Sequence, residues 1–267
     1  MSLPSSAEVT ERVGIHARAL NDGVDAFFTG ALLDGVTVAN LAHHVPHVPD
    51  LLAAARARVA DLSGTDVEAW HLMRQVHGAR VAVVDDQVPP GAELRDVDVM
   101  VTTLLDRPLV VLAADCLPIV AAGARAVAVA HAGWRGVVAG VSDALVDALL
   151  REGERTEDLT VAIGPAIGPC CYEVGDEVRD AVAAVEPGAV TRTQDGRGSV
   201  DLRAAFRSRL RARGVTEVMD VPDAGGGRGA CTACDPRWFS HRRDPRSGRH
   251  AAIIVRRGDA TVGGDRT

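Results

Sequence analysis

Two histidines and one cysteine follow apolar runs that predict β-strands. His77, Cys116 and His131 each lie at or just beyond the end of such a run. Because the strands of one sheet present their ends along a common edge, we expect the three side chains to converge. Two imidazoles and a thiolate match a catalytic zinc shell, which has three protein ligands and one open position. Zinc in such a shell lowers the pKa of bound water to about 7 and supplies hydroxide at neutral pH.

The same side chains are also suited to nucleophilic catalysis, with Cys116 as the thiolate and His131 as its base. Shortly after His131, Trp134 and Arg135 stand between two glycines where a helix is expected to begin. An aromatic ring and a guanidinium at a helix start suit a stacking surface beside an anion site. The residues alone leave the metal centre and the nucleophile open as alternatives.

The elements that must position these residues are predicted from hydrophobic periodicity. The predicted strands are 69–76, 80–84, 109–114, 126–130, 160–163, 217–221 and 251–255, and the predicted helices are 48–60, 137–150, 174–185 and 201–213. Strands and helices mix without regular alternation, which favours an α+β fold over a Rossmann or barrel arrangement.

The chain length of 267 residues is within reach of one large domain. No internal repeat or dividing linker is present, and the glycine-rich stretch 223–229 is interpreted as a loop. We therefore expect a single domain over residues 1–257, followed by a flexible C-terminal tail over 258–267.

The basic residues are all of one type, because each of the 29 Lys and Arg positions is Arg. This excludes a Schiff-base lysine, a Walker P-loop and a protein-kinase lysine. Any anion held by a cationic side chain must be held by Arg or His, and Arg offers phosphate a planar fork. The net charge of −7 and the absence of a basic block disfavour nucleic-acid binding.

Neither a signal peptide nor a membrane-spanning run of about twenty apolar residues is evident in the sequence. We therefore expect a cytoplasmic protein without a membrane partner, whose five cysteines are reduced.

Other clusters of metal-binding residue types are weaker signals. Cys231 and Cys234 form a lone C-x-x-C, which is interpreted as a loop, with a redox pair as the alternative. Cys170 and Cys171 are adjacent and not well placed to share one metal, so one of them is expected in the core. The histidine-rich run 43–47 is expected to be a surface loop, and the arginine-rich segment 242–249 is either a solvated turn or a phosphate clamp.

Several short motifs appear in a fixed order between residues 70 and 255. They are Gln75-Val76-His77-Gly78, Asp98 with Thr102, Ala114-Asp115-Cys116-Leu117-Pro118, His131-Ala132-Gly133-Trp134-Arg135-Gly136, Ile163-Gly164-Pro165 with Cys171-Tyr172-Glu173-Val174, Asp201-Leu202, Cys231-Thr232, and Phe239-Ser240-His241-Arg242-Arg243-Asp244 with Gly248-Arg249. In these motifs the chain resembles the laccase-domain family, also called the YfiH-like or peptidoglycan editing factor family.

The resemblance implies a four-layer α-β-β-α sandwich with mixed sheets and one zinc ion per chain. It maps the zinc ligands, which are also the catalytic residues, onto His77, Cys116 and His131. It implies that purine nucleosides (adenosine, inosine, guanosine and methylthioadenosine) react with phosphate to give base and pentose 1-phosphate, and that adenosine is also deaminated. The residues expected to bind substrate are Asn40, Arg135, Arg242 and Arg243.

The N-terminal part departs from the family pattern, since the usual arginine and paired glycines are missing from residues 28–36. The tyrosine that usually precedes the paired arginines is His241 here. If the N-terminal arm closes over the substrate, its departure is expected to change the affinity for substrate or the range of substrates. The alternatives are a peptidoglycan-precursor cysteine hydrolase, a copper polyphenol oxidoreductase and a non-enzymatic scaffold. Copper is less expected because no two of the nine histidines form an H-x-H pair, and a monomer or small homo-oligomer is expected.

Overall fold

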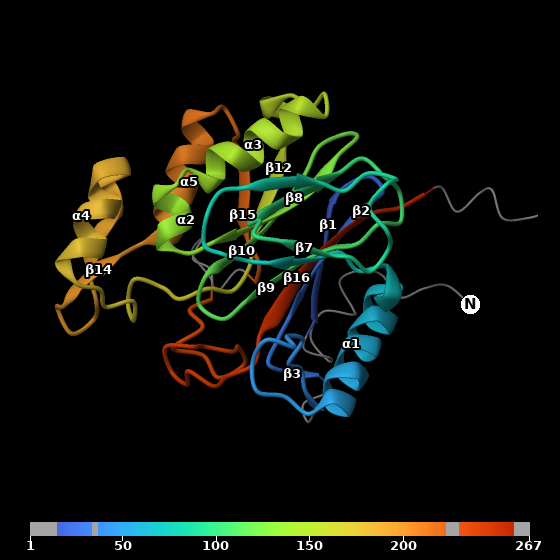
Figure 1. Ribbon diagram of the computed structural model, residues 1–267. Coiled ribbons are helices and arrows are strands. Elements are labelled where there is room, and N and C mark those ends of the chain that lie inside the picture. Colours follow the sequence, from blue (N-terminus) through green and yellow to red (C-terminus); the bar gives the residue numbers. More distant parts are fainter. Residues whose placement is uncertain (1–14, 34–36, 223–229, 259–267) are drawn as a thin grey trace, which may run out of the picture.

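The computed structural model describes residues 15–33, 37–222 and 230–258 (Figure 1). The predicted loop 223–229 and residues 259–267 of the predicted tail lie outside the described residues. No helix in the described ranges is both long enough and apolar enough to cross a membrane.

Two β-sheets pack face to face and form the centre of the molecule (Figure 1). In spatial order, the four-stranded sheet contains β1 (Ile15–Asn21), β2 (Val24–Thr29), β16 (His250–Arg256) and β9 (Leu109–Ala113). The six-stranded sheet contains β15 (Glu217–Asp220), β12 (Thr160–Ile163), β10 (Leu117–Ala122), β11 (Val127–Ala132), β8 (Val99–Thr102) and β6 (Val81–Val83). Side chains such as Phe28, Met100 and Ile254 fill the space between the sheets.

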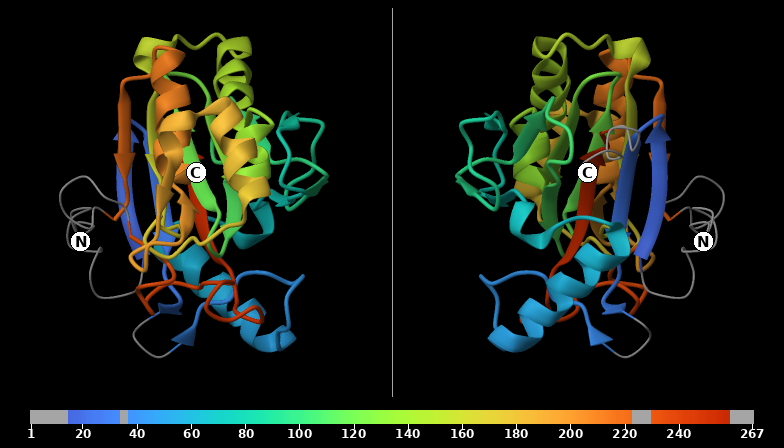
Figure 2. Two further views of the ribbon diagram at one scale, coloured as in Figure 1. Left: turned by 90° about the vertical axis from the view of Figure 1, so that its left-hand side faces the viewer. Right: turned by 90° about the vertical axis from the view of Figure 1, so that its right-hand side faces the viewer.

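Helices cover both outer faces, and Figure 2 shows them on opposite sides of the sheets. The outer face of the six-stranded sheet carries α2 (Trp134–Val138), α3 (Val141–Arg151), α4 (Asp176–Val185) and α5 (Leu202–Ala212). The outer face of the four-stranded sheet carries α1 (Pro49–Ser63). The predicted four-layer α-β-β-α fold in one domain is therefore confirmed.

The six-stranded sheet is mixed, as predicted: β10 pairs antiparallel with β11 and β12, whereas β12 and β15 are parallel, as are β6 and β8. Apart from His131 in β11, its central strands β10 and β11 are apolar because both of their faces are covered. Three small two-stranded sheets lie outside the main pair. They are β3 (Leu32–Leu33) with β4 (Thr37–Val38), β5 (Leu72–Arg74) with β7 (Glu93–Arg95), and β13 (Val190–Arg192) with β14 (Gly198–Val200).

Two predicted elements differ from the structure. The predicted helix 137–150 is two helices, because Gly140 has a φ of 80° and separates α2 from α3. The predicted strand 69–76 is reduced to the three residues of β5. Ala69 ends the 3₁₀ turn Val67–Ala69, His71 forms an isolated bridge to Leu109, and the last residues form a loop. The predicted helix at 201–213 is α5, with Asp201 as its N-cap accepting the N–H of Ala204 at 3.0 Å.

Candidate metal centre

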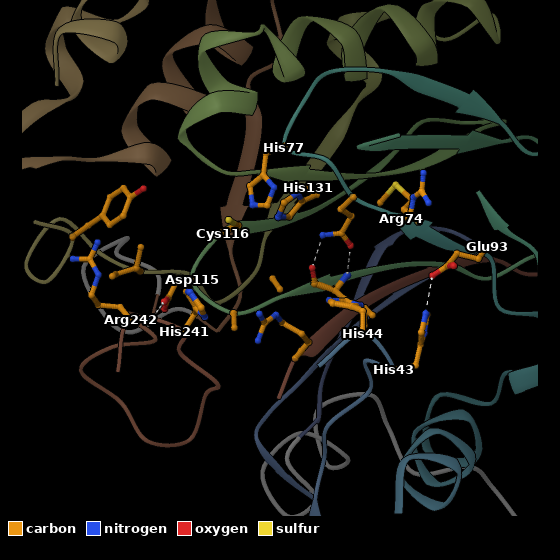
Figure 3. A pocket seen from close by; sticks show the side chains of 18 residues that line it. His43, His44, Arg74, His77, Glu93, Asp115, Cys116, His131, His241 and Arg242 are labelled. Atoms are coloured by element: carbon orange, nitrogen blue, oxygen red, sulfur yellow. Dashed lines mark hydrogen bonds and ion pairs between the residues drawn. The ribbon is translucent and has the colours of Figure 1, made fainter. Parts of the chain in front are cut away.

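His77, Cys116 and His131 converge in the structure, as Figure 3 shows. Their ligand atoms all lie within 4.8 Å of one another. The two imidazole rings meet nearly edge to face, with centroids 4.7 Å apart and an interplanar angle of 79°. The predicted grouping of two imidazoles and one thiol is thus present in the fold.

The three residues reach this point from different parts of the architecture, which corrects the expectation of strand ends in one sheet. His77 lies in the loop after β5, and β5 belongs to neither main sheet. Cys116 lies in the crossover 114–116, which leaves the four-stranded sheet and enters the six-stranded one. His131 is inside β11 rather than beyond its end. The junction between the two sheets brings them together.

Asp98 holds two of these residues in place. Its Oδ1 lies 2.9 Å from Nδ1 of His131 and accepts the backbone N–H of His77 at 3.0 Å. Its Oδ2 accepts the N–H of Gly78 at 2.7 Å. The carboxylate is fully buried, and it leaves Nε2 of His131 as the nitrogen available to a metal. A carboxylate behind a ligating histidine is the usual support of a metal ligand.

The backbone around the site is constrained as well. His77 has a φ of 62° and Asp115 a φ of 88°, values that residues with a side chain adopt only when their surroundings hold them there. The position of Gly133 has no room for a side chain. A Cβ at Gly133 would lie 2.8 Å from Cδ2 of His77 and 3.0 Å from Sγ of Cys116.

The electrostatics favour a thiolate. Burial raises the pKa of the Cys116 thiol, but the imidazoles of His131 and His77 outweigh this and bring it down to about 6. For His131 the effects have the opposite signs. Burial lowers the pKa of its imidazole, but the interactions with Cys116 and Asp98 outweigh burial and raise this pKa to about 9. These two shifts favour an imidazolium–thiolate pair, and a bound cation would take the place of the imidazolium proton. The donor set therefore fits a divalent ion that binds nitrogen and sulfur.

A cavity of about 590 Å³ opens over the three ligands. Figure 3 shows Asp115, His241 and Arg242 on one side of it, and His43, His44, Arg74 and Glu93 on the other. Arg249 and Tyr172 also line the cavity. Its volume is typical of a small-molecule site.

Three comparisons with known proteins agree with this architecture. The family model described as multi-copper polyphenol oxidoreductase laccase matches residues 29–257. The chain belongs to this laccase-domain, YfiH-like family. A purine nucleoside phosphorylase of Mycobacterium tuberculosis is 40% identical over 217 residues, covering 80% of this chain and 83% of that protein. An adenosine deaminase from an unknown prokaryotic organism is 35% identical over 239 residues, covering 83% and 89%. The crystal structure of the YfiH protein of Bacillus licheniformis has a TM-score of 0.78 at 28% identity, covering 88% and 93%.

The arginine segment of this YfiH-like chain divides into two roles. Arg242 lines the cavity, donates to the carbonyl of Glu173 at 3.0 Å, and lies 5.3 Å from the ring centroid of Tyr172. Arg243 instead donates to the carbonyls of Thr232 and Trp238, both at 2.6 Å, and is not among the residues lining the cavity.

The other two residues expected to bind substrate, Asn40 and Arg135, are not among the residues that line the cavity. Asn40 accepts the backbone N–H of Arg249 at 3.0 Å, so it positions a residue that does line the cavity. The guanidinium of Arg135 lies 4.4 Å from the ring centroid of Trp134. The cavity is lined by Tyr172 rather than by Trp134, the aromatic residue from which the sequence predicted a stacking surface.

The histidine-rich run 43–47 is an exposed loop, as predicted. Beyond that prediction, His43 and His44 line the cavity, and Nε2 of His43 lies 3.4 Å from Glu93. Two polar histidines beside a proline look like an ordinary loop, so the sequence signal was weak. The expectation of a core cysteine is wrong: neither Cys170 nor Cys171 is a core residue, since both are half-buried.

Proposed function

We propose that this chain is a zinc-dependent purine nucleoside phosphorylase that also deaminates adenosine, with one zinc ion at the site of His77, Cys116 and His131. The observation that carries the proposal is the convergence of these three ligands under a cavity lined by arginines. The phosphorylase and deaminase names of its relatives support the same reaction class. We expect the enzyme to act in the cytoplasm on a purine nucleoside and phosphate.

His77, Cys116 and His131 would hold the ion, and Asp98 would fix the ring of His131. When bound, zinc would supply a Lewis acid at the floor of the cavity. We assign zinc to this site because two imidazoles and one thiolate match the three protein ligands of a catalytic zinc site, which leaves one coordination position open for a substrate atom.

Phosphate is assigned to the arginines of the cavity wall. Within the described part of the chain, neither Arg242 nor Arg249 forms an ion pair with a carboxylate, whereas Arg74 is paired with Asp96 at 2.5 Å. Two guanidinium groups without such partners can bind and orient the phosphate that attacks the pentose. Asn40 supports this role indirectly, through the backbone of Arg249.

The nucleoside is assigned to the opening between Tyr172 and the metal ligands. Burial raises the pKa of Tyr172 to about 12, so its hydroxyl stays protonated and its ring can stack on a base. Asp115 accepts the hydroxyl of Thr232 and the backbone N–H of Arg242, both at 2.6 Å. This carboxylate fixes the wall against which the substrate lies.

Chromatography of reaction mixtures tests the proposal. Zinc-loaded protein should convert adenosine and phosphate to adenine and ribose 1-phosphate, and adenosine alone to inosine. The His77→Ala variant should lose both activities. Zinc-loaded wild-type protein that forms neither adenine nor inosine would overturn the proposal.

A copper polyphenol oxidoreductase is the second candidate, because the matching family model carries that description. The described residues contain two clusters that could hold a metal, and only one of them includes histidines. A multi-copper centre requires more imidazoles than this. Metal analysis of the protein, with zinc and copper offered together, separates the two candidates.

A cysteine hydrolase acting on a peptidoglycan precursor is the third, because the depressed pKa of Cys116 suits a nucleophile. This candidate predicts activity in metal-free protein and its loss on alkylation of Cys116. The zinc enzyme predicts no activity in metal-free protein, alkylated or not.

A further inference from the structure

A second cluster of metal-ligating side chains lies outside the candidate active site. The thiols of Cys170, Cys171, Cys231 and Cys234 all lie within 4.8 Å of one another. Sγ of Cys234 is 3.2 Å from Sγ of Cys171 and 3.6 Å from Sγ of Cys170. All four are free cysteines, so no disulfide accounts for their approach.

The fold brings these sulfurs together from two distant segments. One is the turn after β12, where Cys170 and Cys171 follow Gly168, and the other is the segment that carries Cys231 and Cys234. The two segments are joined by the bridge between Ala166 and Cys231. The N–H of Gly168 also donates to Sγ of Cys231 at 3.2 Å. The backbone therefore places the four thiols, and their grouping is not a chance meeting of flexible side chains.

We propose that these four cysteines bind a second metal ion, a structural Zn²⁺. Four thiolates at a Zn–S distance of about 2.3 Å form a tetrahedron whose sulfurs lie about 3.8 Å apart. The separations of 3.2 Å and 3.6 Å reach this arrangement with small side-chain adjustments. Thiolate ligands select zinc over hard cations such as Mg²⁺ or Ca²⁺. Four protein ligands leave no open position, so the ion is structural rather than catalytic.

The consequence of this site lies in the wall of the cavity. Tyr172, which lines the cavity, directly follows Cys171. Thr232 lies within the C-x-x-C and donates its hydroxyl to Asp115 at 2.6 Å. Zinc bound by the cysteines fixes both segments and so holds the Tyr172 and Asp115 side of the cavity. This role is independent of the reaction that the cavity performs.

Metal analysis of protein purified under reducing conditions tests the proposal. The wild type should hold about two zinc ions per chain, and Cys234→Ser and Cys170→Ser should each hold about one. The His77→Ala variant should also fall to about one, through the other site. The Ala233→Ser variant places a hydroxyl in the same loop without removing a sulfur, and should keep about two.

Cobalt substitution gives a readout that needs no activity. In the His77→Ala background, Co²⁺ should produce the intense near-ultraviolet sulfur-to-cobalt absorption of a tetrahedral thiolate site, and adding Cys234→Ser should abolish most of it. Thiol counting by mass spectrometry after alkylation distinguishes the alternative. A Cys171–Cys234 disulfide in anaerobically prepared protein, or about one zinc per chain in both the wild type and Cys234→Ser, would overturn the proposal.

Discussion

At the scale of single residues, one buried carboxylate does most to organise the candidate metal centre. Asp98 accepts the ring N–H of His131 and the backbone N–H groups of His77 and Gly78. These bonds outweigh the cost of burying the carboxylate, and they hold the pKa of Asp98 below its ordinary value. One side chain thus sets the orientation of one ligand and the strained backbone of another.

Asp98→Asn should weaken zinc binding by about 10- to 100-fold, because an amide cannot accept all of these bonds at once. Competition with a chromogenic chelator measures the affinity. The matched control is Asp96→Asn, two residues away, where the carboxylate pairs with Arg74 on the surface. An Asp98→Asn protein with wild-type zinc affinity would remove the positioning role assigned to this residue.

Gly133→Ala should lower zinc affinity by more than about tenfold, since the new methyl group would press on His77 and Cys116. Gly175→Ala is a close control. Both glycines precede a helix in the same extended conformation, at φ −82° and −72°, but among the described residues no atom beyond the chain neighbours lies within 4 Å of a Cβ at Gly175. Zinc titration of the two variants makes the comparison, and equal affinities would show that Gly133 is not needed for space.

At the scale of elements, the hairpin between β10 and β11 depends on a side chain from elsewhere. Glu154, which follows α3, accepts the backbone N–H groups of Ala124, Arg125 and Ala126 at 2.9, 2.6 and 2.7 Å. The turn is therefore closed by a carboxylate, and β11 carries His131 directly from this hairpin.

Glu154→Ala should lower the free energy of unfolding by roughly 2–4 kcal/mol, because three amides lose a charged acceptor. Urea denaturation measures this. Glu152→Ala, two residues earlier at the end of α3, should cost less than about 0.5 kcal/mol. Similar losses in both variants would mean that the hairpin does not depend on the carboxylate.

The sequence predicted elements well where burial leaves a local pattern. The runs at 109–114 and 126–130 are β9 and β11 to within two residues. That these two strands belong to different sheets could not be predicted from the sequence, because sheet membership depends on pairing between distant strands.

The candidate metal centre was predictable from residue types, whereas the cysteine cluster was not. Cys170 and Cys231 are separated by about 60 residues, and each pair of cysteines looks unremarkable by itself. The grouping depends on the bridge between Ala166 and Cys231, which cannot be predicted from a local sequence pattern.

At the scale of the whole molecule, the buried histidine at the start of β16 links stability to pH. His250 is fully buried among the layers, next to Trp238, with Nε2 3.2 Å from the carbonyl of Pro165. Burial lowers the pKa of His250 from 6.5 to about 4, the neighbouring charges being Asp115 and Arg249. In the unfolded chain the pKa returns to about 6.5.

Between pH 6.5 and 4 the unfolded chain therefore binds a proton that the folded chain does not, so stability falls as the pH falls through this window. The loss reaches about 3 kcal/mol for this group. His250→Gln should flatten the dependence of the unfolding free energy on pH, as followed by urea denaturation at several pH values. His47→Gln, at an exposed histidine, should leave the slope unchanged, and an unchanged slope in His250→Gln would contradict the assignment.

The crossover that carries Cys116 gives the metal a role in the connectivity of the molecule. An ion held by His77, Cys116 and His131 would close chain loops of about 40 and about 15 residues across the junction of the two sheets. Removing the ion would open these two loops and restore their conformational freedom, while both sheets stay intact. Amide hydrogen exchange should then quicken in the loop after β5 and in residues 114–116, while the centres of β10 and β11 stay protected. Loss of the metal would thus be detected as a local opening of the junction, separate from global unfolding.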